Sequence, residues 1–176
     1  MKFTFFIVIM MFSISSCKNP RDLPTVSHVD LNQYIGTWYE IARLPNRFEK
    51  GLEHVSATYS FREDGKIKVL NGGRDSIGNW KQSIGKAWVP DSDQPGRLKV
   101  QFFWPFAGNY YIIALDEEYQ YALVGDPSRK FLWVLSKTKQ LDSDIYNQLL
   151  DIAENSGFDV DQMMLVDQAD ESNSGQ

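Results

Sequence analysis

The chain has 176 residues, 14% of them aromatic, and carries a formal net charge of −5 at pH 7. This length suits one domain with a hydrophobic core, and the aromatic content favours strands over helices. Because the net charge is negative and no stripe of basic residues is visible, we do not expect nucleic acid as a partner. One cysteine and two histidines, His28 and His54, exclude an intramolecular disulfide and a metal site rich in these ligands, so we expect no metal and no cofactor.

The amino-terminal segment predicts export and a lipid anchor. Lys2 precedes an apolar run over residues 3–14, which is shorter than the ~20 residues of a membrane-spanning helix and fits a signal peptide. Ile14-Ser15-Ser16-Cys17 resembles the lipobox of bacterial lipoproteins, which implies cleavage before Cys17, a diacylglycerol thioether on its sulfur, and an acyl group such as palmitate on the new N-terminus. The alternative is an ordinary secretory signal with a chance cysteine.

The predicted lipid anchor divides the start of the chain into a signal peptide at residues 1–16 and a flexible polar tether at residues 17–29, which begins at lipidated Cys17. Several acyl chains give a stable anchor where one chain binds only marginally. Lys18 follows the cysteine, and by analogy with enterobacterial sorting this favours the outer membrane of a bacterial cell envelope.

From residue 36 onward, short apolar or aromatic runs alternate with turn signals. Ala57, Tyr59 and Phe61 alternate with polar residues in a clean period of two, and the following Asp64-Gly65 is a hairpin signal. Eight strands are expected, at residues 38–44, 55–61, 66–70, 82–89, 98–102, 110–115, 121–125 and 131–137. Without crossover helices, they predict an all-β fold, an eight-stranded antiparallel up-and-down β-barrel with room for one small ligand.

One helix comes after the strands. It begins after a cap at Asp142 or Ser143 and ends before Gly157, and its short apolar stripe predicts packing outside the barrel. A membrane-surface helix is the alternative, which the acidic residues on its other faces disfavour. A last short strand is expected at residues 163–166, which gives a barrel domain at residues 30–167 and a disordered acidic tail at residues 168–176.

Three segments resemble the signatures of the lipocalin family in their family order. Gly36-Thr37-Trp38 resembles the first signature, the segment from Asp116 to Val124, with Tyr121, the second, and the segment from Leu132 to Lys137 the third. The chain departs from the pattern at Leu115, where the family has Thr, and at Lys137, where it has Arg. The likeness covers residues 30–166 and is greatest to the bacterial outer-membrane members, then to vertebrate apolipoprotein D.

The resemblance implies structural roles for Gly36, Trp38, Asp116, Tyr121 and Lys137. Trp38 is expected to plug the closed end of the barrel, with the Lys137 cation over its ring, a contact worth ~0.5–2 kcal/mol. Lys lacks the planar stacking surface of Arg, so a looser contact is expected.

The resemblance further implies a lipid-anchored protein that binds fatty acids or lysophospholipids in the barrel, for storage or transport of envelope lipids. Trp133 is the leading pocket candidate because its position resembles a pocket Trp of apolipoprotein D, and alternation adds Tyr59. Weaker candidates are Tyr111, Phe103 and Asn71, and plain core packing is the alternative for each of the five.

No catalytic residue is expected. The lipase elbow, the P-loop and the dinucleotide fingerprint are absent from the sequence, and Asp116, Glu117 and Glu118 fit a solvated turn better than a catalytic pair. Two alternatives to a lipid carrier stay open: a lipid-modifying enzyme on the same scaffold, and an anchored structural or interaction lipoprotein without a physiological ligand. The oligomeric state is open as well, with a homodimer among the alternatives.

Overall fold

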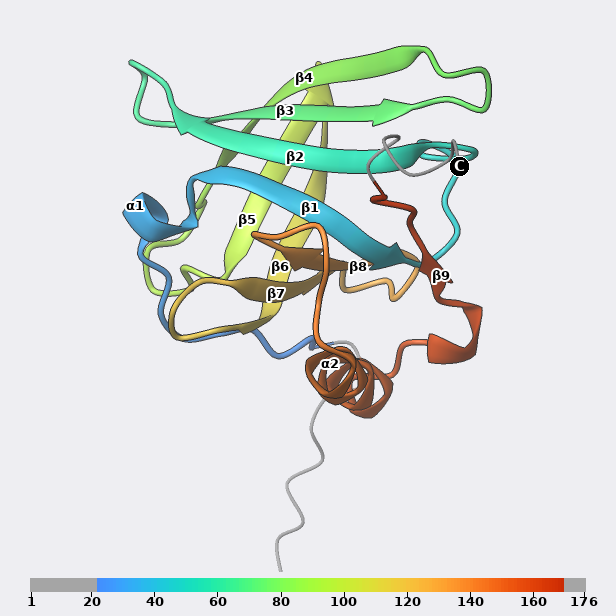
Figure 1. Ribbon diagram of the computed structural model, residues 1–176. Helices are drawn as coiled ribbons and strands as arrows, with labels where there is room; N and C mark the ends of the chain where they lie inside the picture. Colours follow the sequence, from blue (N-terminus) through green and yellow to red (C-terminus); the bar gives the residue numbers. More distant parts are fainter. Residues whose placement is uncertain (1–21, 170–176) are drawn as a thin grey trace, which may run out of the picture.

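The chain forms a sheet of antiparallel strands in which each of the first seven pairs with the next (Figure 1). The computed structural model describes residues 22–169. The strands are β1 (Gly36–Arg43), β2 (Glu53–Phe61), β3 (Ile67–Arg74), β4 (Trp80–Trp88), β5 (Arg97–Phe103), β6 (Phe106–Leu115), β7 (Tyr121–Gly125) and β8 (Leu132–Ser136). Because β8 also pairs with β1, the sheet closes. The predicted eight-stranded barrel is confirmed.

Alternation places one face of each strand inside the barrel. Tyr59 of β2 lies opposite Val69 of β3, and both side chains belong to the interior cluster of buried residues. Strands β1 to β6 are all longer than predicted, and the difference is greatest for β3 and β6. Strand β3 continues past its predicted end at residue 70 through Gly72, where the ring of Trp80 packs on the bare backbone, only 2.5 Å from the position of a Cβ.

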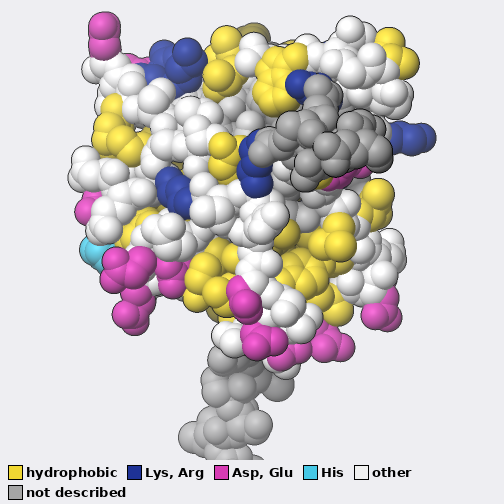
Figure 2. Space-filling model, in the orientation of Figure 1, with side chains coloured by type: hydrophobic (Ala, Val, Ile, Leu, Met, Phe, Trp, Pro, Cys, Tyr) yellow, Lys and Arg dark blue, Asp and Glu magenta, His cyan; other side chains and the backbone are white. Residues whose placement is uncertain are grey.

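A second cluster lies outside the barrel under helix α2 (Ser143–Asn155). The helix buries Leu149 and Ala153 against a group that includes Leu132 and Val134 of β8. Asp142 caps it by accepting hydrogen bonds from two backbone N–H groups of the first turn. The predicted external position is confirmed, and acidic side chains gather on the outer surface of this region (Figure 2). No helix among residues 22–169 is long and apolar enough to cross a membrane.

Residues 22–29, expected as part of a flexible tether, instead lie against the barrel. Leu23 is fully buried in the outer cluster, and the Val26 N–H donates to the carbonyl of Ile112 at 3.0 Å. Val26 and Val29 also pack against the interior cluster, so several contacts hold a segment that shows no apolar periodicity. The short helix α1 (Leu31–Tyr34) comes next and was not predicted. The predicted signal peptide and lipidated Cys17 lie outside the described residues.

The carboxyl-terminal segment lies beside β1, beyond the point where β1 and β2 stop pairing. After η1 (Val160–Gln162), the short β9 (Met164–Leu165) pairs with the end of β1. The amide of Gln168 then donates to the carbonyls of Glu40 in β1 and Val55 in β2, at 2.9 and 2.8 Å. Gln168 is buried, so the disordered tail expected from residue 168 does not begin there.

Candidate functional site

The barrel interior is closed at one end by an aromatic floor. Trp38 is fully buried, and its indole Nε1 donates to the Tyr34 carbonyl of α1 at 2.7 Å. The Lys137 Nζ lies 4.3 Å from the centroid of the Trp38 ring and donates to the Ile35 carbonyl at 2.8 Å. Burial lowers the pKa of Lys137. The cation therefore joins the floor to α1.

Three tyrosine hydroxyls form a hydrogen-bonded chain above the floor. The Tyr110 oxygen lies 2.7 Å from that of Tyr34 and 3.0 Å from that of Tyr59. Burial raises the pKa of Tyr59 to about 12 and raises those of Tyr34 and Tyr110 well above the ordinary value. The three groups stay neutral at physiological pH and offer hydroxyls, not charge, to the interior.

A charged cluster crosses the mouth end. Arg43 donates through Nη1 to the Glu40 carboxylate at 2.7 Å, and through Nη2 to the carbonyls of Glu49 and Leu52 at 3.0 and 2.9 Å. Glu40 and Arg43 are almost fully buried. Burial, followed by the neighbouring Glu49, raises the pKa of Glu40 to about 8, although Arg43 opposes the shift.

The same cluster reaches the predicted pocket tryptophan. The Trp133 Nε1 donates to the Glu49 carboxylate at 3.0 Å, and the Trp133 ring stacks on Phe131 with centroids 6.0 Å apart. Phe131 in turn contacts Phe48, whose ring is 65% exposed in the loop between β1 and β2. A row of aromatic rings thus runs from the outer surface at the mouth to the interior.

Burial differs among the inward-facing residues of the barrel. Trp38, Val69 and Leu98 are at most 2% exposed. Other interior residues are only half-buried although they belong to the same cluster: Ala57, Val100, Phe102, Tyr110 and Trp133. The wall is therefore apolar and incompletely covered, which is the surface that an apolar ligand needs.

Three of the five predicted pocket residues face the interior. Tyr59 and Trp133 belong to the interior cluster, and Asn71 lies directly opposite Ala57 in the β2–β3 ladder, on the same face. The Asn71 Oδ1 is buried and has no hydrogen-bond partner. A buried acceptor without a donor costs free energy, and a ligand hydroxyl or amine would relieve that cost.

The structure does not bring Tyr111 and Phe103 into the interior. Tyr111 packs on the outer cluster with the Arg97 guanidinium 5.3 Å from its ring centroid, and Phe103 is 75% exposed. Their neighbours Tyr110 and Phe102 face inward instead. The reason is register: Tyr110 lies opposite Leu98, whose side chain is inside, so Tyr111 must point outward.

Sequence reasoning missed Glu40, Arg43 and Glu49. Alternation from Trp38 and Glu40 would place Ala42 inside and Arg43 outside, but a bulge between Glu40 and Ala42 reverses the alternation. Arg43 then points inward and Ala42 joins the outer cluster. The pair Glu40 and Arg43 was visible in the sequence, but a bulge cannot be located without the partner strand.

The remaining signature residues, Gly36, Asp116 and Tyr121, make contacts that support the fold. Gly36 has a φ of +99°, and a side chain there would approach the Lys137 Nζ at 3.5 Å. Asp116 accepts from the Gln120 N–H within the turn between β6 and β7. Burial, then Asp116, raises the pKa of Tyr121, which packs on the outer cluster. No group of three His, Cys, Asp or Glu suited to a metal occurs among the described residues.

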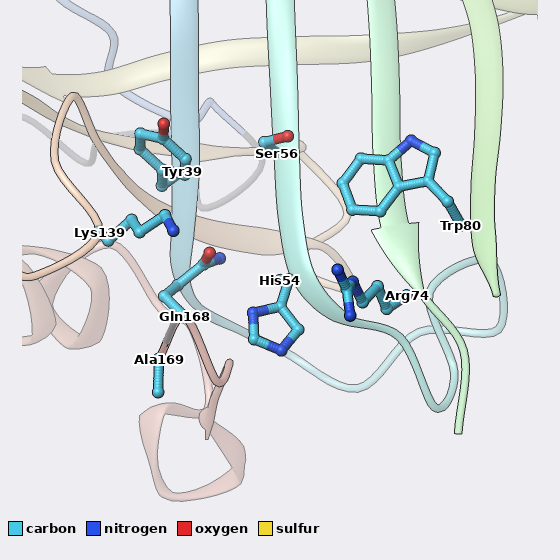
Figure 3. A pocket seen from close by; sticks show the side chains of 8 residues that line it. All are labelled: Tyr39, His54, Ser56, Arg74, Trp80, Lys139, Gln168 and Ala169. Carbon is cyan, nitrogen blue, oxygen red and sulfur yellow. The ribbon is translucent and has the colours of Figure 1, made fainter. Parts of the chain in front are cut away.

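A pocket of about 220 Å³ lies on the outer wall where the carboxyl-terminal segment crosses β1 and β2 (Figure 3). Figure 3 shows Gln168 between Tyr39 of β1 and His54 of β2, with Arg74 and Trp80 beyond His54. His54 has a φ of 52°, and its N–H donates to the Asp167 carbonyl at 2.7 Å. Gln168 and Ala169 line this pocket. We therefore attribute the pocket to the packing of the carboxyl-terminal segment on the barrel wall, and we do not assign a ligand to it.

The comparisons with known proteins agree with this architecture. Residues 29–168 match the family model of a lipocalin-like domain. The outer membrane lipoprotein Blc of Escherichia coli (strain K12) is 45% identical over 160 residues, which cover 90% of each chain. Apolipoprotein D of Macaca fascicularis is 34% identical over 165 residues, covering 89% of this chain and 85% of that protein. Insecticyanin from the tobacco hornworm superposes with a TM-score of 0.69 at 23% identity, over 85% of this chain and 86% of its own, which supports the fold alone.

Proposed function

The chain belongs to the lipocalin family, and we propose that it is a membrane-anchored carrier that takes fatty acids or lysophospholipids into its barrel. Lipocalins are in general binding and transport proteins for small hydrophobic molecules. The observation that carries the proposal is the interior wall, which is closed at the floor by the fully buried Trp38 and carries apolar side chains that are only partly covered. Each methylene of a lipid tail buried there gains about 0.8 kcal/mol.

The polar groups on the wall favour a particular way of binding. The charged cluster at the mouth has two carboxyl groups, those of Glu40 and Glu49, and one guanidinium, Arg43, which donates to Glu40 and to two backbone carbonyls. A fatty-acid carboxylate buried there would lie near the acidic Glu49, and Arg43 already serves other acceptors, so the added negative charge would lack a partner. The tail therefore enters first, and the head group stays near the mouth. The free Asn71 Oδ1 suits the glycerol hydroxyl of a lysophospholipid.

The anchor is the second part of the proposal. Its support is the lipobox-like segment ending at Cys17 and the similarity to relatives that are outer membrane lipoproteins. We infer attachment to the outer membrane of a bacterial envelope, where the carrier would store or transport envelope lipids. Cys17→Ser should remove incorporation of a palmitate analogue in growing cells. Equal labelling of the variant and the native chain would refute the anchor.

Binding is tested by titrating saturated fatty acids and lysophosphatidylcholines of increasing chain length while following tryptophan fluorescence. We expect affinity in the micromolar range or better, about 8 kcal/mol, rising with chain length until the interior is full. Trp133→Ala should weaken binding by at least ~1 kcal/mol and leave the circular dichroism of the sheet unchanged.

Trp88→Ala is the matched control, because alternation from inward-facing Ala87 places Trp88 on the outer face. It should bind like the native protein. Affinity that does not depend on chain length, or native affinity in Trp133→Ala, would refute the proposed interior site. Turnover of the added lipids would favour an enzyme instead.

A further inference from the structure

The barrel wall is incomplete between β4 and β5. These strands pair through only three residue pairs, Lys86–Gln101, Ala87–Val100 and Trp88–Lys99, all at the floor end. Toward the mouth, β4 continues to Trp80 but pairs only with β3. The β3–β4 and β5–β6 hairpins leave the sheet in different directions (Figure 1). The two strands thus separate halfway along the wall.

The separation begins at Gly85. A side chain at this position would meet the Phe102 ring and the Gln101 carbonyl at 2.8 Å, so the Phe102 ring lies against the bare backbone of β4. Alternation from Gly85 directs Ser83 and Lys81 to the inner face, yet both are exposed. The described residues thus leave these two side chains of β4 exposed, and Phe102, which packs against the interior cluster, lies where β4 and β5 separate.

The side chains that border the gap are large and apolar. At the tip of the β5–β6 hairpin, Phe103, Trp104 and Phe106 are 75%, 85% and 78% exposed, and we call them the hairpin patch. Ile84, on β4 across the gap, is 63% exposed. No charged residue occurs from residue 101 to residue 110. Contiguous exposed apolar groups of this size mark contact with an apolar partner or a membrane.

The start of the described chain indicates that the partner is a bilayer. Asp22 is held by Arg97, whose Nη2 donates to its carboxylate at 2.8 Å, so the chain begins at the opposite end of β5 from the hairpin patch. β5 is ~20 Å long at ~3.3 Å per residue. The residues from Cys17 to Asp22 reach at most ~18 Å. A barrel that lies with β5 along the bilayer therefore brings both the anchor and the hairpin patch to one membrane surface.

We propose that the gap between β4 and β5 is a lateral portal, through which the acyl chain of a bilayer lipid enters the barrel while the hairpin patch is seated in the membrane. This inference rests on the proposed lipid-binding function and anchor. It adds the route: the tail passes over Phe102 directly from the hydrocarbon region into the apolar wall, without crossing water or the charged cluster at the mouth.

The first test uses the mature lipidated protein and phosphatidylcholine vesicles that contain a self-quenched lysophosphatidylcholine with a fluorescent acyl chain. Uptake is followed as dequenching. The triple variant Phe103→Ser, Trp104→Ser, Phe106→Ser should take up lipid from vesicles at least tenfold more slowly, while its Kd for the same lipid as a monomer stays within twofold. The double variant Phe61→Ser, Leu165→Ser, exposed elsewhere at 49% and 71%, should behave like the native protein.

Native uptake by the triple variant would overturn the proposal. If the native protein itself does not bind the monomeric lipid, the proposed function fails instead, so the two failures can be told apart.

A second test separates passage through the gap from mere docking. Once the Cys17 thiol is consumed by the lipid, Ser83→Cys offers one reactive thiol inside the gap, and Ser60→Cys offers a matched exposed thiol on the outer face of β2. A bulky maleimide on Cys at position 83 should slow uptake from vesicles severalfold, and the same label at position 60 should not. Equal uptake rates for the two labelled proteins would refute the portal.

Discussion

The wall of this barrel separates in two places, and only one of the two seams is filled by another segment of the chain. Between β1 and β2, pairing covers Gly36–Tyr39 and ends, but β9 and Gln168 continue the wall with hydrogen bonds to both strands. Between β4 and β5, pairing ends after three residue pairs, and no described segment takes its place. The first seam is buried and polar, whereas the second is exposed and apolar at its edges.

Where two neighbouring strands diverge, the barrel wall can therefore be either closed by another segment or left open. A backbone segment that can satisfy the freed N–H and carbonyl groups makes the first seam a source of stability. Where no such segment exists, the freed groups face solvent and neighbouring side chains are free to serve binding. We therefore expect substitutions at the first seam to affect unfolding, and substitutions at the second to affect ligand exchange only.

The largest effect is expected for Trp38→Ala, in the paired part of β1 and β2 next to the first seam. Trp38 is fully buried and lies opposite Ala57 across the β1–β2 pairing, so its removal leaves a cavity that should cost ~3–5 kcal/mol. Urea unfolding followed by circular dichroism measures this. Trp104→Ala, at the second seam and 85% exposed, is the matched control and should change stability little. Similar losses in the two variants would abolish the distinction between the seams.

Gln168→Ala tests the segment that closes the first seam. The substitution leaves the buried carbonyls of Glu40 and Val55 without their donor, which should cost ~1–3 kcal/mol. Hydrogen exchange should also accelerate at the Val166 N–H, which donates to the Ile41 carbonyl. Gln94→Ala removes an exposed amide of the same chemistry and should have no such effect. Unchanged exchange in the Gln168 variant would mean that other contacts hold this segment.

The pH dependence of stability should report Glu40, which lies beside the first seam. Burial raises its pKa to about 8, so the folded state favours the protonated form. This contribution is fully present below the unfolded pKa of ~4.3 and is lost as pH rises through 8, with a slope of at most ~1.4 kcal/mol per pH unit. Glu40→Gln should flatten the fall in stability between pH 5 and pH 8, measured as Tm. Glu63→Gln, an exposed control, should keep the native profile, and an unchanged profile in Glu40→Gln would contradict the assignment.

The smallest effect on stability is expected for Ile84→Thr at the second seam. Ile84 is 63% exposed and Thr is compatible with a strand, so the change should stay within about 0.5 kcal/mol. Val69→Thr, 2% exposed on the adjacent strand, buries a hydroxyl and should cost more than ~1 kcal/mol. Thermal unfolding of the two variants measures this difference in stability. An equal loss in both would show that the edge of β4 contributes as much to stability as the interior does.

Local patterns in the sequence were enough to predict the strands and some of the residues that face the barrel interior. The alternation of residues 57–61 with the Asp64-Gly65 turn predicted β2 and its hairpin, and Asp142 and Gly157 bracketed α2. Alternation predicted the inward position of Tyr59 correctly because β2 pairs regularly with β3 from Ser56 to Phe61. Trp133 came from a family resemblance rather than from alternation.

Tertiary structure decided the features that depend on a partner far along the chain. The bulge after Glu40 turns Arg43 inward. The pairing of Leu98 with Tyr110 places Tyr110 inside the barrel and Tyr111 outside, so the neighbour of the predicted pocket residue faces the interior. Leu23 and Gln168 gained their buried positions from surfaces assembled by other segments.

The sequence by itself determined a closed antiparallel barrel with an external helix, because period-two alternation and turn residues act over a few neighbouring positions. Which seam is filled and which is left open depended on where the carboxyl-terminal segment docks and where β4 parts from β5. Those are long-range pairings, set by register and by the packing of whole elements, and no short stretch of sequence encodes them.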